Sequence, residues 1–201
     1  AMTKASETQF LEGDQVGAFI VRYADLSTPG SLGAANYAAN LKFTCNATGR
    51  FLPDNVLEWY TVAQGESAKS DFYAYYPYNA NIDLSKLDAV PFSVKKDQST
   101  YANHTASDFM WVRVLDVTPE IEGVPMVFKH VMSRFVLNVK AATGTLDPSK
   151  LQVKFKGVKT FLTWDLGTMQ ANNRDSIANV TPYQLTSPAS GYAASYAVIL
   201  P

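Results

Sequence analysis

Short runs of alternating apolar and polar residues, each closed by a turn signal, are the feature that most limits what this chain can fold into. The strongest run covers residues 109–117, where apolar side chains stand at both odd and even positions. Further along, Phe135, Leu137 and Val139 share one face of an extended chain. Runs of this length, separated by Gly, Pro, Asn and Asp, are typical of β-sandwiches. The sequence therefore predicts an all-β fold.

The same reading gives a map of expected elements along the chain. A helical turn is expected at residues 83–87, and a seam between two domains is predicted near Pro119, Gly123 and Pro125. The predicted domains are residues 1–124 and 125–201. Strands are predicted at residues 16–21, 37–45, 57–60, 71–76, 109–117, 124–140, 151–156, 158–164 and 196–200.

Composition narrows the classes of protein to which the chain can belong. Apolar residues make up 47% of the 201 residues, which is enough to fill a sizeable core. The formal net charge is −1 and the longest basic run is Lys95-Lys96, so we expect no nucleic-acid partner. No stretch approaches the roughly 18–20 apolar residues of a membrane-spanning helix.

The sequence lacks the motifs that mark common catalytic and metal sites. It has no HExxH, GxSxG, P-loop, GxGxxG or CxxC pattern. Cys45 is the single cysteine, and its strand-like surroundings predict a small buried apolar residue. His104 lies in a polar stretch, where we expect a solvated side chain. His130 lies in a strand pattern, where we expect a buried imidazole bonded to a backbone carbonyl.

The acidic residues also favour structural roles over chemistry. Asp14, Asp54, Asp165 and Asp175 stand at turn signals, where aspartate is favoured for bonding to its own backbone. A glycosidase would need two carboxyl groups facing one another across a cleft, and spacing along the chain does not report this. We therefore predict no catalytic, cofactor-binding or metal-binding residues and no enzymatic activity.

The one unusual constellation is aromatic, in residues 71–79 (DFYAYYPYN). On a strand, Phe72 and Tyr76 share one face while Tyr73 and Tyr75 share the other. One interpretation is a platform on which sugar rings stack. The other, which we favour, is a core strand whose bulky groups are buried on both faces.

At this motif the sequence resembles the fimbrillin-like (Mfa-like, type V pilin) proteins of Gram-negative cell surfaces. DFYAYYPYN is similar to the family's x-x-F-x-A-Y-Y-P-Y signature. Three more pieces agree with the family in order: residues 10–19 (FLEGDQVGAF), residues 127–139 (VFKHVMSRFVLNV), and residues 161–168 with 197–201.

The resemblance implies two β-sandwich domains of transthyretin-like topology, with the second incomplete because the family's usual last strands do not occur before Pro201. Either the chain is truncated there, or it is a shorter member whose second domain is completed by other means. It implies export through the periplasm, a lipid anchor to the outer membrane in the precursor, and a place in surface fimbriae. It also implies that subunits assemble by strand addition, after proteolytic removal of an N-terminal strand in family pilins. Thr3-Lys4-Ala5 stands roughly where the family is often basic at that cleavage site.

Taken together, these features predict a structural or accessory subunit of cell-surface fimbriae. Its expected partners are other fimbrial subunits and, for adhesion, host or bacterial surface ligands. The alternative is a surface glycan-binding β-sandwich module that uses Trp59, Trp111 or the tyrosines of residues 72–78. A hydrolase fragment ranks last.

Overall fold

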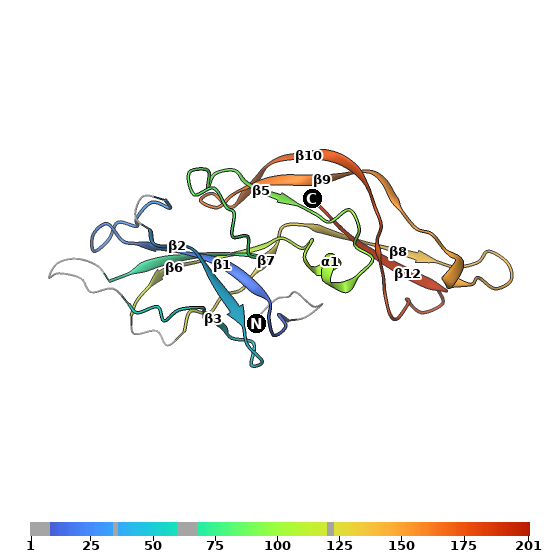
Figure 1. Ribbon diagram of the computed structural model, residues 1–201, viewed down its shortest axis with the longest axis horizontal. Coiled ribbons are helices and arrows are strands. Elements are labelled where there is room, and N and C mark those ends of the chain that lie inside the picture. The colour runs from blue at the N-terminus through green and yellow to red at the C-terminus, as the bar shows by residue number, and fades with distance from the viewer. Residues whose placement is uncertain (1–8, 34–35, 60–67, 120–122) are drawn as a thin grey trace. The chain divides into compact units, whose positions relative to one another are not determined.

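The computed structural model describes residues 9–33, 36–59, 68–119 and 123–201, and Figure 1 shows that they are built mainly from β-strands. The predicted all-β class is confirmed. The chain forms two compact units. The first unit comprises Ala1–Val90, Phe109–His130 and Trp164–Gln170. The second comprises Pro91–Asp108, Val131–Thr163 and Ala171–Pro201. Each unit is thus assembled from three segments, and the single seam between residues 124 and 125 stays a prediction.

The first unit is built around an antiparallel six-stranded sheet in the order β3-β2-β1-β4-β6-β7. The edge strands β3 and β7 are only three and two residues long. Short edge strands offer little backbone for pairing with a foreign chain. The strands are β1 (Gln15–Arg22), β2 (Asn36–Cys45), β3 (Phe51–Pro53), β4 (Ser70–Tyr76), β6 (Met110–Val117) and β7 (Lys129–His130).

Strand β4 lies in the interior of this sheet, between β1 and β6, and all seven of its residues are buried. Its aromatic run explains why: a strand with bulky apolar groups on both faces is stable only when both faces are covered. Tyr73 is 6% exposed, Tyr75 1% and Tyr76 5%. The interpretation of this segment as a core strand is confirmed.

A buried carboxylate fixes the end of the pairing between β4 and β6. Asp71 is 1% exposed, and its Oδ1 accepts a hydrogen bond from the backbone N–H of Asp116 at 2.9 Å. Asp116 has a φ of 59° at the point where the register of the two strands shifts. A bulge leaves a backbone N–H without a ladder partner, and the Asp71 side chain satisfies it.

The second unit holds two three-stranded sheets, in the orders β10-β9-β5 and β11-β12-β8. β5 begins one residue before the unit does, and β9 continues two residues beyond it. None of the helices in the described residues is long and apolar enough to cross a membrane. The elements are β5 (Val90–Ser93), α1 (Tyr101–Thr105), β8 (Ser133–Val139), the 3-10 helix η1 (Pro148–Lys150), β9 (Phe155–Asp165), β10 (Gln170–Val180), β11 (Tyr183–Gln184) and β12 (Ala194–Leu200).

The side chain of Gln98 completes the pairing of β12. β12 pairs with β8 on one side and with β11 on the other, but β11 reaches only Tyr196 and Ala197. Gln98 is fully buried; its Oε1 accepts from the Ile199 N–H at 2.9 Å and its Nε2 donates to the Ile199 carbonyl at 2.8 Å. The amide thereby makes the two bonds that a further strand residue would make.

Several expected elements differ from those observed. Residues 57–59 form no strand, and the strand after β2 is β3, because Asn46 Oδ1 accepts from the Thr48 and Arg50 N–H groups and turns the chain earlier. Where two strands were expected at 151–156 and 158–164, a single strand, β9, begins at Phe155 and runs through Gly157, which takes a φ of 64°; residues 151–154 form no strand. Strand β10 and helix α1 were not predicted, and residues 83–87 form turns without a helix.

Candidate functional site

The strongest candidate site in the first unit is an apolar pocket of about 440 Å³ on one face of its sheet. Among the described residues that line it, the only charged one is Arg50. Pockets of this volume are in the range that binds ligands or partner side chains. The pocket is lined by Phe10, Val16, Ala18, Phe43, Gly49, Arg50, Phe51, Leu52, Phe72, Ala74, Gly123, Val124, Pro125, Met126 and Val127.

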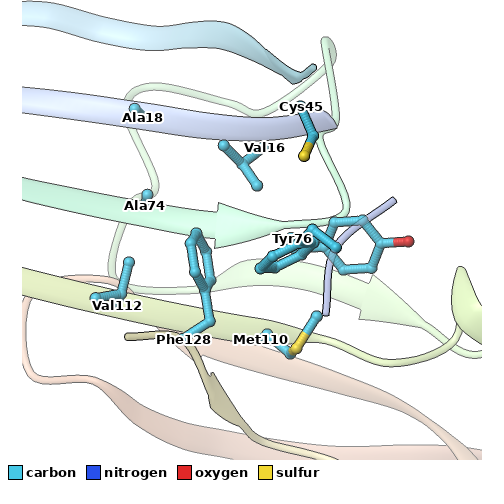
Figure 2. Packing of buried hydrophobic residues seen from close by; sticks show 9 residues of the cluster. Val16, Ala18, Cys45, Ala74, Tyr76, Met110, Val112 and Phe128 are labelled. Carbon is cyan, nitrogen blue, oxygen red and sulfur yellow. The ribbon is translucent and has the colours of Figure 1, made fainter. Parts of the chain in front are cut away.

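The floor of the pocket is low because two alanines are cross-strand partners. Ala18 on β1 pairs with Ala74 on β4, and Ala74 pairs in turn with Val112 on β6. Figure 2 shows the short side chains of Ala18 and Ala74 on neighbouring strands, with Val16 further along β1. Cross-strand partners lie about 4.5–5.5 Å apart, so two methyl groups side by side leave a hollow where larger residues would fill the layer.

One wall of the pocket comes from residues 124–127, which follow β6 in the chain. Their burial alternates: Val124 and Met126 pack against the core, while Val127 is 50% exposed. This is the burial pattern of a strand, yet residues 124–127 belong to none of the sheets formed by the described residues.

Part of the pocket lining is aromatic: it includes Phe10 and, on β3, Phe51 beside Leu52. The ring centroids of Phe10 lie 4.9 Å from Phe51 and 5.0 Å from Phe128, both edge to face. Edge-to-face packing of this kind holds the rings in fixed orientations. This part of the pocket is therefore preformed.

The groups with shifted pKa values near this core serve structure. Burial raises the pKa of the Cys45 thiol, which is 2% exposed, as predicted for a small buried residue. Burial also raises the pKa of Asp14, whose Oδ2 accepts from the Leu11 N–H at 2.7 Å. Neither residue lines the pocket. The pocket offers apolar surface, and the described residues of its lining include no acid–base pair.

The aromatic run that suggested a sugar platform has its rings in the core. Phe72 is 8% exposed, and the Tyr75 hydroxyl donates to Asn40 Oδ1 at 2.7 Å. Trp59 and Trp111 are half-buried; Trp59 Nε1 donates to the Ala68 carbonyl at 2.7 Å. The buried rings of β4 present no face to a sugar, whereas Tyr78, like the two tryptophans, is half-buried.

The two histidines lie in places opposite to those expected. His104, expected to be solvated, is 7% exposed because it lies in α1 and stacks on Tyr183, with ring centroids 5.3 Å apart. The helix begins where Thr100 accepts from the Asn103 N–H. His130, expected to be buried, is exposed in the edge strand β7. Within the described residues, no three side chains of His, Cys, Asp or Glu gather where they could hold a metal ion.

Of the acidic residues predicted at turns, Asp175 instead lies within strand β10, where its Oδ1 accepts from the Ser176 N–H at 2.7 Å. Asp165 Oδ1 accepts from the N–H groups of Gly167 and Thr168, which is the turn expected there. Asp54 pairs with Lys42 at 2.8 Å. These carboxylates are engaged locally. The apolar pocket was not predicted from the sequence, where Ala18 and Ala74 give no signal of the space above them.

Comparison with known proteins identifies solved structures that share this architecture. A proposed cell adhesion protein from Bacteroides uniformis has the same fold, with a TM-score of 0.62 at 19% identity over 96% of this chain and 69% of that protein. A second one, from Bacteroides ovatus, has a TM-score of 0.66 at 19% identity over 95% of this chain and 68% of that protein. A fimbrial protein from Bacteroides ovatus has a TM-score of 0.51 at 16% identity over 99% of this chain and 39% of that protein. No curated protein matches the sequence.

The fold defines the class first: an all-β protein with the architecture of fimbrial and cell adhesion proteins. Residues 3–201 match the fimbrillin-like family, which is nearly the whole chain. The chain belongs to the fimbrillin-like family. The resemblance found in its motifs is thereby confirmed.

Proposed function

We propose that this chain is a non-enzymatic structural subunit of cell-surface fimbriae, and that its apolar pocket accepts a β-strand from a neighbouring subunit. Membership of the fimbrillin-like family and the likeness to fimbrial and cell adhesion proteins support a fimbrial place at the cell surface. The observation that carries strand addition is the pocket itself. Its lining joins an apolar floor to residues 124–127, whose burial alternates as in a strand and which belong to no sheet among the described residues.

The volume of the pocket sets the size of the strand it accepts. A cavity of about 150 Å³ holds one benzene ring. The 440 Å³ pocket therefore holds about three apolar side chains of that size. Because alternate residues of a strand point to the same face, three inward side chains require a segment of about five or six residues. Backbone bonds to residues 124–127 would supply affinity, and the pocket would select the alternating pattern.

The remaining features of the proposal come from the family resemblance. The precursor is anchored by lipid to the outer membrane after export, and the assembled fimbria supports adhesion to host or bacterial surfaces. The predicted cleavage site at Thr3-Lys4-Ala5 lies outside the described residues. These features do not depend on the pocket, and each can be tested on the native precursor.

A peptide-binding experiment tests the pocket directly. The probe is a blocked eight-residue peptide in which valine alternates with threonine; the control peptide has the same composition with its four valines contiguous. We expect calorimetry to show binding of the alternating peptide alone. Ala18→Leu, which extends a side chain from the floor into the pocket, should weaken binding at least tenfold. Ala38→Leu, on the same sheet but outside the pocket lining, is the matched control and should bind as the wild type does.

Two results would contradict the proposal. One is that neither peptide binds the wild-type chain. The other is that Ala18→Leu binds the alternating peptide as tightly as Ala38→Leu does, because a strand seated in the pocket must compete with the added side chain. Thermal melts of both variants check that each is folded.

A further inference from the structure

Charge is distributed very unevenly between the two compact units, although the whole chain is nearly neutral. The second unit has nine Lys and Arg residues and four Asp residues, a formal net charge of +5. The first unit has eight Lys and Arg residues and fourteen Asp and Glu residues, a formal net charge of −6. Together they give the −1 of the whole chain. Each unit therefore carries a substantial field of its own sign.

The positive charge of the second unit is concentrated around the start of β9. Lys154, Lys156 and Lys159 lie within six residues of chain, and all three are exposed. Lys159 Nζ donates to the backbone carbonyl of Arg174 on β10 at 3.0 Å, which brings a fourth basic residue to the same sheet. Among the described residues, Lys154 and Lys156 have no acidic partner. We call Lys154, Lys156, Lys159 and Arg174 the basic surface.

The basic residues of the first unit are, in contrast, often held by acidic neighbours. Lys42 pairs with Asp54 at 2.8 Å and Lys69 with Asp116 at 2.7 Å. Each pair neutralises one cation and one carboxylate, so the net charge of the first unit stays −6. Exposed pairs of this kind add little stability, about 0–1 kcal/mol.

We propose that the basic surface of one copy docks against the acidic first unit of a second copy, and so sets the order in which subunits meet. This inference rests on the proposed function, in which subunits assemble by strand addition. Contact of like units is disfavoured, because charges of the same sign meet. Contact of unlike units is favoured, and complementary charge can raise association rates by 10–10³-fold. A second copy fits better than another anionic partner because this chain itself carries an acidic unit of nearly equal and opposite charge.

Single charge reversals in the full chain test the proposal. Lys156→Glu lowers the charge of the basic surface, whereas Lys86→Glu makes the same chemical change on the first unit, where Lys86 is 72% exposed. Each variant takes the net charge of the chain from −1 to −3. We expect Lys156→Glu to slow association between chains several-fold at about 20 mM salt, while Lys86→Glu leaves the rate unchanged or faster. Surface plasmon resonance with immobilised wild-type chain measures the rate.

Salt and a compensating variant complete the test. The rate for the wild-type chain should fall between 20 and 300 mM salt, since exposed charges are screened over about 8 Å at physiological ionic strength. Lys154→Glu/Lys156→Glu should associate faster with Glu12→Lys/Glu58→Lys than with the wild-type chain. Equal effects of Lys156→Glu and Lys86→Glu, or rates independent of salt, would overturn the inference. The inference would also be overturned if Lys156→Glu lost binding to anionic lipid vesicles while its association with other chains was unchanged. Binding of the alternating peptide to the pocket is measured separately, so failure of the proposed function can be distinguished from failure of the charge-based docking.

Discussion

Adding one methyl group at Gly17 should destabilise the first unit strongly. Gly17 on β1 is the cross-strand partner of Tyr75 on β4. A Cβ at Gly17 would lie 2.4 Å from Cε1 of the Tyr75 ring, 2.5 Å from Cζ and 2.6 Å from the hydroxyl oxygen. The ring is 1% exposed, and its hydroxyl donates to Asn40 Oδ1 at 2.7 Å and accepts from the Asn79 N–H at 3.1 Å. The tyrosine therefore cannot turn aside without breaking these bonds.

The size of the effect follows from these contacts. The ring must retreat by about 1 Å to reach an ordinary carbon–carbon separation of about 3.5 Å. Overpacking of a well-filled core costs about 1–3 kcal/mol, and each hydrogen bond that the Tyr75 hydroxyl loses costs about 1 kcal/mol more. For Gly17→Ala we expect the free energy of unfolding to fall by about 3–5 kcal/mol.

The three tryptophans make the measurement specific, because Trp59, Trp111 and Trp164 all lie in the first unit. Urea unfolding followed by tryptophan fluorescence therefore reports this unit. Gly167→Ala is the matched control: its Cβ would meet only Asp165 Oδ1 at 3.3 Å, and the loss should stay below about 1 kcal/mol.

A double variant shows whether the clash is the cause. In Gly17→Ala/Tyr75→Leu the phenol ring is gone, so the alanine should cost much less than it does in the wild-type background. The expected coupling is at least about 1 kcal/mol. If Gly17→Ala lies within about 0.5 kcal/mol of the wild type, or if the two changes are additive, the argument from the close approach of Tyr75 is wrong.

Three further outcomes are expected. Gln98→Ala should lower the free energy of unfolding of the second unit by about 2–4 kcal/mol, because it leaves the buried Ile199 N–H and carbonyl without partners. Urea unfolding followed by circular dichroism measures the loss. As a control, Gln152→Ala at an exposed position should cost under about 0.5 kcal/mol. Hydrogen bonds from the Ser27 backbone and from Thr28 hold the pKa of Asp25 at about 2, below its unfolded value of about 3.9. The stability that Asp25 contributes is therefore complete above pH 4 and is lost as pH falls towards 2. Between pH 5 and pH 2, the urea midpoint of Asp25→Asn should fall less steeply than that of the wild type. Cys45 should resist Ellman's reagent in the native chain and react once urea unfolds the first unit, since it is buried and burial raises its pKa; rapid reaction of the native thiol would contradict its position.

The strands that could be predicted from the sequence are those whose apolar residues are buried. β1, β4, β6 and β12 lie within two residues of their expected bounds because their side chains alternate or are apolar on both faces. β10 could not be predicted, since its residues QANNRDSIANV are mostly polar and exposed. Its strand conformation comes from pairing with β9, and a polar sequence carries no sign of its partner.

The apolar pocket could not be predicted for a related reason. Alanine is common at buried strand positions, and nothing in a linear sequence indicates that Ala18 and Ala74 are opposite each other. A shift of β1 by one residue against β4 would move the Ala18 methyl group to the other face and remove the hollow. The burial of the aromatic run, in contrast, could be predicted, because so many bulky groups on both faces of one strand require cover.

The amide of Gln98 has a consequence for how this protein avoids unwanted association. Unpaired backbone groups along the edge of a sheet can pair with an extended segment of another chain, which leads to aggregation. The Gln98 side chain binds the backbone groups of Ile199 at a position on β12 that β11 does not reach. An extended segment of another chain therefore cannot pair with β12 at Ile199, although no further strand covers that position.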